Sequence, residues 1–371
     1  MTTSIEPFQA SWLTRNKLKV APFLFLAPAL FFFCVYVVIP IFQSLQLSLF
    51  EWNGLYNADG ESTAIYIGLS NYAKLWVDPN FWVSIKNNIL WIILYMLAIP
   101  AGLFVALFLN QTVTGMRFYK SLFFFPFVIS QVVVGLIFGW FYNPDFGVIA
   151  KVWQLFFCEE AINIVGNVTI KCRVPVPDIL SSPDWATYGI IFAGLWPQIA
   201  YCMILYLTGL NNVASEQIEA GRLDGAKGWK MLWYVVLPQL KPATFIAVIV
   251  TIIGALRSFD MIAIMTQGGP FGSTNVLSHY MFEVAISEYG ERYGYGSAIA
   301  TVLFGIMMIF ISYFLWRMYQ DEKRGTSNSK SYSRISGCLS GFLTNCFDLM
   351  VVALDRDFPN ICSGFKGHQY R

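Results

Sequence analysis

Long apolar runs separated by short polar segments dominate the hydrophobic pattern of this chain. A span of a lipid bilayer takes about 20 consecutive apolar residues in a helix. Runs of that length lie near Val20–Gln43, Asn87–Leu109, Ser121–Tyr142, Tyr188–Leu210, Pro242–Met265 and Ser297–Arg317. The pattern predicts an all-α polytopic membrane protein with six transmembrane helices.

One segment between the fourth and fifth runs breaks this pattern by mixing charged and apolar residues. It extends from Glu216 to Pro242 and follows 31 residues, Trp185 to Ser215, that carry no charge. Its first part predicts a short helix with Ser215 as N-cap, since acidic Glu216 and Glu219 fall near the positive N-terminal end.

The second part of this segment predicts another short helix after a sharp turn. Gly225 and Gly228 permit the turn because glycine adopts backbone angles that other residues avoid. The second helix has an apolar face, and Pro238 is expected to end or kink it. That face consists of Leu232, Val235, Val236 and Leu240.

Composition agrees with a membrane protein and excludes several other classes. Only 12% of the 371 residues are charged and 56% are hydrophobic, whereas soluble domains carry roughly 25% charged residues. The net charge of +2 gives no sign of nucleic-acid binding. The first apolar run is too long for a cleavable signal peptide and lacks a small-residue cleavage site, so we expect it to remain as a span.

Cysteine and histidine residues give no metal or catalytic pattern. Seven Cys occur without a C-x-x-C pair, and neither His279 nor His368 has a ligand partner at helical spacing. Cys34 and Cys202 lie in apolar runs and are interpreted as small core residues. Cys158 and Cys172 share one predicted external loop, where a disulfide and free thiols are equally compatible with the sequence.

Lysine and arginine counts orient the predicted spans. With the N-terminus in the cytoplasm, seventeen of these residues fall on the inner side and six on the outer side. Positive residues favour the cytoplasmic side. The mixed segment after the fourth span is therefore predicted to be cytoplasmic, as are both termini.

The mixed segment resembles the E-A-A loop of membrane subunits of bacterial ATP-binding-cassette importers. The pattern of that family reads E-A-A, three residues, G, nine residues, I-x-L-P. The matching residues here are Glu219, Ala220, Gly221, Asp224 within the spacer, Gly225, Val235, Leu237 and Pro238. Gly221 replaces the usual Ala and Val235 the usual Ile. The resemblance implies that residues 211–241, the coupling loop, dock on a separate ATP-hydrolysing subunit.

Further motifs resemble the carbohydrate-uptake branch of these permeases, and loosely its α-glucoside type. They include Y-I-G-L-S-N-Y, D-P-N-F-W, Y-N-P, S-F-D-M-I-A-I-M-T-Q-G-G-P-F-G-S-T-N-V-L and G-Y-G-S-A-I-A-T-V-L-F, and the resemblance covers about Val20 to Met318. It implies a subunit of a sugar importer in the bacterial inner membrane. The implied partners are a second similar permease, two ATP-binding subunits, a periplasmic solute-binding protein, the sugar and membrane lipid.

The source of energy is expected to lie outside this chain. No G-x-x-x-x-G-K-[ST] phosphate loop occurs, so we expect no cofactor here and place ATP and magnesium on the partner subunit. An ion-coupled secondary transporter is the alternative, and it would need carboxylates within its spans. The only acidic candidate is Asp260, which can pair with Arg257 on one helix face. A membrane-embedded enzyme is a weaker alternative, because no nucleophile–base set is visible.

Two spans supply groups that suit the passage of a sugar. Small and hydroxyl-compatible residues recur at helical spacing on either side of the coupling loop, and Trp196 is a stacking candidate. The predicted substrate path consists of Gly194, Gln198, Tyr201, Thr251, Ala255 and Ser258. Helix–helix packing explains the same residues equally well, since small and weakly polar residues are favoured there too.

The predicted organisation has a permease domain between two short flanks. Residues 1–19 form a cytoplasmic N-terminus, 20–318 the transmembrane domain and 325–371 a disordered tail without assigned function. Within the domain, residues 143–187 form an extended periplasmic loop, which either contacts the solute-binding protein or is an insertion without a role.

Overall fold

The computed structural model describes residues 25–55, 63–111, 114–162, 168–172, 174–287 and 291–325. The chain divides into two compact units, Met1–Ile309 and Phe310–Arg371, and each is considered by itself. The described part of the second unit is the C-terminal part of the last helix. The predictions for residues 1–19, and for the tail beyond residue 325, lie outside the described residues.

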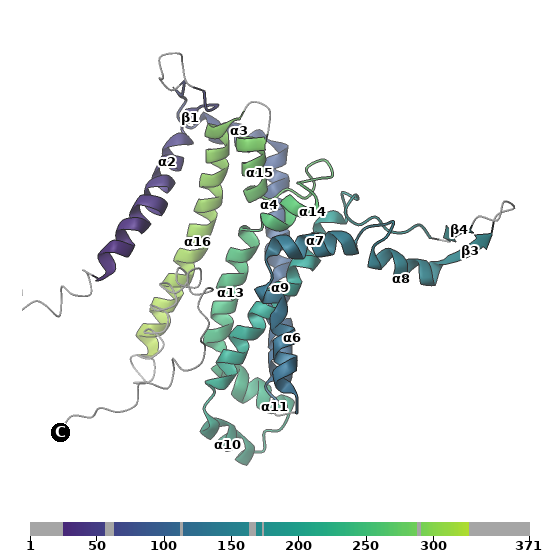
Figure 1. The fold of residues 1–371 in the computed structure, drawn as a ribbon. Coiled ribbons are helices and arrows are strands. Elements are labelled where there is room, and N and C mark those ends of the chain that lie inside the picture. Colours follow the sequence, from purple (N-terminus) through teal and green to yellow (C-terminus); the bar gives the residue numbers. More distant parts are fainter. Residues whose placement is uncertain are drawn as a thin grey trace, which may run out of the picture. The chain divides into compact units, whose positions relative to one another are not determined.

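Most described residues lie in helices, and the spans follow the predicted order (Figure 1). The first helix, Phe25–Leu47, contains η1 (Cys34–Val38) and α2 (Ile39–Leu47). The remaining helices are α3 (Ser70–Val77), α4 (Pro79–Tyr95), α5 (Ala98–Leu109), α6 (Met116–Val128), α7 (Gln131–Phe141), α8 (Val148–Phe157), α9 (Ala186–Asn211), α10 (Ser215–Leu223), α11 (Trp229–Met231), η2 (Leu232–Val236), α12 (Leu237–Gln239), α13 (Lys241–Leu256), α14 (Asp260–Met265), α15 (Leu277–Phe282), η3 (Glu283–Ser287) and α16 (Tyr293–Gly325).

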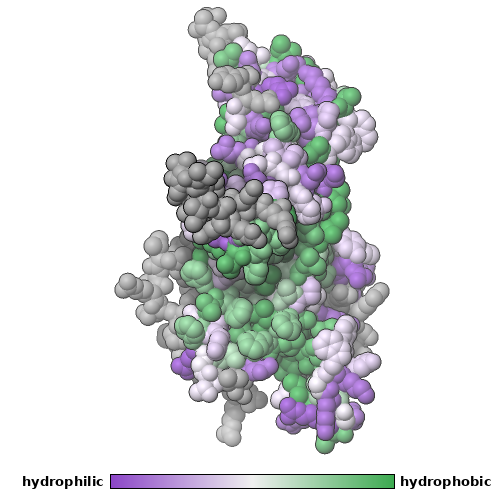
Figure 2. Space-filling view, turned by 90° about the vertical axis from the view of Figure 1, so that its right-hand side faces the viewer, coloured by the Kyte–Doolittle hydropathy of each residue, from purple (hydrophilic) through white to green (hydrophobic). Residues whose placement is uncertain are grey.

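The described residues hold four helices that are long and apolar enough to cross a membrane, or up to six if each of two bent pairs is one span. The all-α class of the prediction is confirmed. On the face drawn in Figure 2, hydrophobic residues gather in a band between regions with more hydrophilic residues. Such a band is what a lipid-facing surface requires, because no water is present there to solvate polar groups.

The predicted third span, Ser121–Tyr142, is a bent pair of helices rather than one continuous helix. α6 and α7 meet at a bend of 97°, and Ile129 and Ser130 between them have extended backbone angles. Pro126 lies inside α6 rather than at the bend. The uninterrupted apolar run gives no sign of this break.

The predicted fifth span, Pro242–Met265, is also divided. α13 ends at Leu256, and α14 begins four residues later. Arg257 and Asp260 lie on either side of the break, both exposed, and make no ion pair among the described residues. Their predicted pairing on one helix face is therefore wrong, because no single helix carries both.

Two π-helical turns each precede a proline. Cys34–Val38 is followed by Pro40, and Leu232–Val236 by Pro238. A proline ring clashes with the carbonyl four residues earlier in an α-helix. Widening the preceding turn relieves that clash, so both helices continue through the proline.

α9 is the central helix of the first unit. It packs against α4, α5, α6, α7 and α13. The approach to α5 is close: a Cβ atom on Gly102 would lie 2.5 Å from Cys202 Cβ. Small residues at such contacts let two membrane helices pack backbone to backbone. Cys202 is buried as predicted, but Cys34 is exposed, so the core assignment of Cys34 is wrong.

Two small antiparallel sheets lie outside the helical bundle. β1 (Phe50–Glu51) pairs with β2 (Ile65–Tyr66), and β3 (Cys158–Ile162) pairs with β4 (Val168–Cys172). The second hairpin and α8 give the long segment 143–187 structure of its own. Cys158 is disulfide-bonded, and the residue opposite it in the hairpin register is Cys172.

Candidate functional site

The first half of the coupling loop is the short helix α10, which a glycine terminates. Gly225 has φ +82°. The Ala226 amide donates to the Gly221 carbonyl at 2.9 Å, and the Gly225 amide donates to the Arg222 carbonyl at 3.1 Å. This pair of hydrogen bonds is the Schellman motif, which needs a left-handed residue at the position of Gly225. The predicted turn at Gly225 is present.

The N-terminal end of α10 differs from the prediction. Ser215 is the first residue of the helix, and Ala214 occupies the N-cap position without a side-chain hydrogen bond. The Ala214 amide instead donates a hydrogen bond to Gln239 Oε1, at the far end of the loop, at 3.3 Å. The serine is therefore not needed as a cap, and the start of α10 is fastened to α12.

Gly221 is the point at which the two halves of the coupling loop touch. A Cβ atom there would lie 3.0 Å from Val235 Cγ2 and 3.3 Å from Met231 Cε. Those distances are shorter than ordinary van der Waals contacts, so even alanine would push the neighbours by a few tenths of an ångström. Glycine at the third position of Glu-Ala-Gly thus brings α10 against α11 and η2.

The opposite side of α10 is open to solvent and charged. Glu219, Ala220 and Asp224 are exposed, and Leu223 is 90% exposed. Glu219 makes no ion pair among the described residues. An exposed leucine beside unpaired charges is a surface suited to contact with another protein.

Leu237 and Pro238 begin the last turn of the loop. Pro238 does not end the helix, because the π-helical turn before it accommodates the ring. The direction changes only at Leu240, where Trp229–Gln239 meets Lys241–Leu256 at 70°. Leu240 is buried with Tyr206 and Leu210 of α9, so the bend is anchored in the core.

The predicted substrate path separates into two groups, of which one is a polar contact between spans. Gln198 Nε2 on α9 donates to Thr251 Oγ1 on α13 at 2.9 Å. Thr251 is fully buried, and Cys202 Sγ lies 3.8 Å from its hydroxyl. These residues join the spans that flank the coupling loop.

The second group consists of packing positions. A Cβ atom on Gly194 would lie 2.2 Å from Tyr95 Oη, and Ala255 is fully buried in the same cluster as Trp91 and Tyr95. The small side chains therefore leave room for aromatic rings of α4. Neither ring was among the predicted path residues.

Tyr201 and Ser258 complete the predicted path, and Ser258 belongs with the second group because its side chain is hydrogen-bonded to Tyr95, the residue that fills the space beside Gly194. The Tyr201 ring lies 5.4 Å from the ring of Phe127 on α6. Ser258 Oγ donates to the Gly254 carbonyl at 3.2 Å. The rings of Phe125 and Phe138 contact Trp196 edge-on. The structure thus brings Gln198 and Thr251 together but does not gather all six residues around one point.

A set of asparagine side chains at the other end of the unit was missed. Asn87 Nδ2 donates to the carbonyls of Ser273 at 2.7 Å and Asn275 at 2.8 Å. The neighbouring Asn88 accepts from the Leu277 amide at 2.9 Å through Oδ1. Two adjacent amides in an apolar run were the available signal, because buried polar groups need partners.

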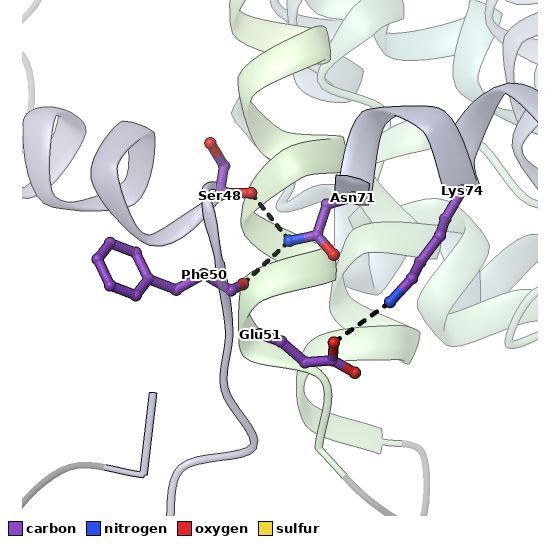
Figure 3. A network of polar contacts seen from close by, with 5 residues as sticks. All are labelled: Ser48, Phe50, Glu51, Asn71 and Lys74. Carbon is purple, nitrogen blue, oxygen red and sulfur yellow. Dashed lines mark hydrogen bonds and ion pairs between the residues drawn. The ribbon is translucent and has the colours of Figure 1, made fainter. Parts of the chain in front are cut away.

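A third asparagine holds the first hairpin in the same way (Figure 3). Asn71 Nδ2 donates to the carbonyls of Ser48 at 2.9 Å and Phe50 at 3.0 Å. Next to it, Lys74 and Glu51 form an exposed ion pair at 3.4 Å. We call Asn71, Asn87 and Asn88, with the backbone that they bind, the asparagine clamp.

The loop held by the clamp presents a single aromatic side chain. Phe271 is 98% exposed and has φ +53°. The clamp fixes the backbone after it through Ser273, Asn275 and Leu277, and Thr274 Oγ1 donates to the Gly269 carbonyl before it at 2.8 Å. A large apolar residue held out in solvent by a rigid loop is a feature of contact surfaces.

A carboxylate and an imidazole lie in the same region. Asp78 accepts from the hydroxyls of Tyr280 and Tyr295, and burial, then Asp78, raises the pKa of Tyr280. His279 Nδ1 lies 2.7 Å from Asn275 Oδ1. Burial lowers the pKa of His279 against the opposing attraction of Glu283.

In the described part of the chain no three His, Cys, Asp or Glu residues could hold a metal ion together.

Comparison with known protein families defines the class of this chain. The model described as "Binding-protein-dependent transport system inner membrane component" matches residues 98–324, more than half of the chain. The chain therefore belongs to this family of inner membrane transport permeases and is not an enzyme. In ABC importers, ATP hydrolysis occurs on separate ATPase subunits.

Three similar proteins are themselves named as permeases of transport systems. The chain is 32% identical over 311 residues to the probable ABC transporter permease protein YurN of Bacillus subtilis, covering 83% of this chain and 99% of that protein. It is 32% identical over 277 residues to the multiple sugar-binding transport system permease protein MsmF of Streptococcus mutans, covering 74% and 87%. It is 29% identical over 314 residues to the alpha-glucoside transport system permease protein AglF of Rhizobium meliloti, covering 83% and 84%.

Solved structures agree on the fold. A chain of a bacterial ABC transporter that imports the acidic polysaccharide alginate superposes with a TM-score of 0.64 at 19% identity, covering 84% of this chain and 97% of that one. A second structure of an alginate transporter, in complex with an alginate-bound periplasmic protein, gives a TM-score of 0.67 at 17% identity and covers 82% and 96%.

Proposed function

We propose that this chain is the permease subunit through which a carbohydrate, an oligosaccharide or glycoside, crosses the inner membrane by alternating access. Relatives whose names state sugar transport cover most of the chain. The observation that carries the mechanism is the geometry of α10. It is a short, exposed, charged helix that is packed on α11–η2 at Gly221 and fastened by Gln239, so a push on α10 is transmitted to α13.

The partners in this proposal are a second homologous permease, two ATP-binding subunits that hold ATP and magnesium, and a periplasmic solute-binding protein. The solved relative bound to a periplasmic protein supports the last of these. Glu219 and Leu223 on α10 and Asp224 at its C-cap face the ATPase subunit, while Phe271 is the side chain that we assign to the binding protein. The comparisons give no support to the ion-coupled alternative.

Orientation follows from charge and from the disulfide. Lysine and arginine favour the side on which the coupling loop lies, which we assign to the cytoplasm, with both termini. Disulfides persist in oxidising compartments, so disulfide-bonded Cys158 supports a periplasmic position for residues 143–187. Impermeant maleimide applied to intact cells should label a cysteine at Asp184 and not one at Lys227. Labelling at position 227 would overturn the orientation and the docking role of α10.

The docking role is tested by reversing one charge in the matched motif. Glu219→Lys should abolish sugar uptake and reduce co-purification of the ATPase subunit, while the permease remains in the membrane. Glu216→Lys is the matched control, since Glu216 is also exposed on α10 but outside the motif. Equal uptake by both variants would remove the docking role from Glu219.

The path proposal rests on the contact between Gln198 and Thr251. Breaking it by Gln198→Leu removes one hydrogen bond, about 0.5–1.5 kcal/mol, and strands the threonine hydroxyl. Uptake in proteoliposomes should fall by roughly threefold to tenfold, and stimulated ATP hydrolysis should be largely unchanged. Wild-type uptake curves for Gln198→Leu, Tyr201→Ala and Ser258→Val would make these residues packing positions only.

A further inference from the structure

The second half of the coupling loop exposes a face that the docking role of α10 does not use. Trp229, Trp233 and Tyr234 are 71%, 51% and 79% exposed. Together with Lys230 they line a shallow hollow of about 360 Å³. The rings of Trp229 and Trp233 meet edge-on with centroids 5.9 Å apart. We call these four residues the Trp229 face.

The orientation of the Trp229 face is fixed by the opposite side of the same helix. Met231 and Val235 pack against Gly221, Val236 contacts the core around Leu240, and Gln239 holds the Ala214 amide. The helix therefore cannot roll to bury its aromatic residues without breaking these contacts. The exposed rings point away from the rest of the described coupling loop.

The bend at Leu240 sets the direction of this helix relative to the membrane. Trp229–Gln239 meets the apolar helix Lys241–Leu256 at 70°. A helix that crosses the bilayer tilts by about 20° on average from the normal. The 11 residues before the bend, which extend for about 16 Å at 1.5 Å per residue, consequently run close to the plane of the membrane surface.

The chemistry of the Trp229 face matches the boundary between lipid and water. Indole and phenol side chains favour the headgroup level, where one edge is apolar and the other hydrated. Lysine places its methylene stem along apolar surface and its ammonium group at lipid phosphates. The face carries no acidic residue, and Lys227 and Lys241 flank it. The acidic residues of the loop lie in and just after α10, where the proposed function places the protein partner.

We propose that the Trp229 face is seated in the headgroup layer of the leaflet next to the coupling loop, with Lys230 bound to a phospholipid phosphate. The helix then rests on the membrane with one face while its other face supports α10. This inference depends on the membrane position of α13 and not on the identity of the transported solute.

Photo-crosslinking tests the proposal on the unmodified chain. The permease is reconstituted in bilayers that contain a phospholipid with a photoactivatable headgroup, and adducts are mapped by mass spectrometry. We expect adducts on residues 229–234 and none on Ser215–Leu223. One basic residue near the membrane surface changes lipid attraction about fivefold. Lys230→Gln should therefore lower the adduct yield by about that factor, and exposed Lys227→Gln should lower it less.

A second measurement separates lipid from protein as the occupant. A polarity-sensitive fluorophore is attached to a cysteine at Trp233 or, as the matched control, at exposed Leu223. Acyl-brominated lipids should quench the label at 233 several-fold more than the label at 223, with or without the ATPase subunits. Equal quenching at both positions, or quenching at 233 that disappears when the ATPase subunits bind, would overturn the proposal. Loss of sugar transport would leave it unaffected.

Discussion

The two ends of the helical unit are held together by different kinds of interaction. At one end, the asparagine clamp fixes backbone carbonyls and amides from distant segments through side-chain hydrogen bonds. At the other end, the coupling loop is held by the close contact at Gly221, the apolar packing of Leu240 and one long hydrogen bond from the Ala214 amide to Gln239. Directional bonds to backbone fix one geometry, whereas apolar contact tolerates sliding. We therefore expect the end that holds the asparagine clamp to stay rigid, and the coupling loop at the other end to move during transport.

The largest expected effect comes from removing the clamp. Asn87→Leu removes the side-chain donor of the Asn275 carbonyl and leaves the Ser273 carbonyl with the longer bond from Thr187 Oγ1 at 3.3 Å. An unsatisfied buried group costs about 1–3 kcal/mol. The midpoint of thermal unfolding of the purified permease should fall clearly. Gln239→Leu at the other end is the matched control. Gln239 is only half-buried, accepts from the Ala214 amide at 3.3 Å and donates to the Val235 carbonyl at 3.1 Å, so its loss should cost about 1 kcal/mol. If both variants lowered the unfolding midpoint equally, the two ends would not differ in how strongly side-chain hydrogen bonds stabilise them.

An intermediate effect is expected at the contact within the coupling loop. Gly221→Val inserts atoms where Val235 already lies 3.0 Å from a Cβ position, and such overpacking costs about 1–3 kcal/mol. Because the strain falls between α10 and η2, uptake should fall about tenfold, and the unfolding midpoint should fall less than in Asn87→Leu.

Gly305→Val on α16 is the control for Gly221→Val, since nothing lies within 4 Å of its Cβ position. It should leave uptake near the wild-type value. A large drop in the unfolding midpoint for Gly221→Val, without an uptake defect, would show that the coupling loop is a structural support rather than a lever.

The smallest expected effect is a pH dependence confined to the clamped end. Burial lowers the pKa of His279, so the folded state favours the neutral ring. The stability that this provides is present above the unfolded pKa of about 6.5 and is lost as the pH falls through the lower folded value. The protection of α15 amides against hydrogen exchange, relative to the intrinsic rate at each pH, should fall as the pH is lowered from about 7 to about 5, and His279→Gln should remove that change. The coupling loop contains no histidine and should not respond.

Local rules predicted the regular parts of the fold and much of the coupling loop. The run Tyr188–Leu210 became α9 (Ala186–Asn211) with small changes at its ends, because a long apolar run in a membrane protein must satisfy its backbone as a helix. The turn at Gly225 was predictable because a left-handed residue without a side chain is the usual end of a helix.

Features that depend on distant contacts were not predictable in this way. The carbonyl partners of Asn87 lie 186 and 188 residues away in sequence, so no window around Asn87 reveals them. The packing around the predicted substrate path was not predictable for a related reason. Helical spacing placed Gly194 and Gln198 on one face, but Gly194 is occupied by the Tyr95 ring of another helix, which spacing within α9 does not report.

The 97° bend between α6 and α7 has a consequence for solvation inside the membrane. The first amides of α7 have no acceptors within their own helix, Ser130 does not cap them, and Gln131 Oε1 is buried without a described partner. Peptide groups at such depth must be met by protein or by water. Polar groups and any water beside this break would offer hydrogen bonds to a hydroxyl-bearing solute. Those bonds would replace part of the solute's hydration shell, which lipid chains cannot do.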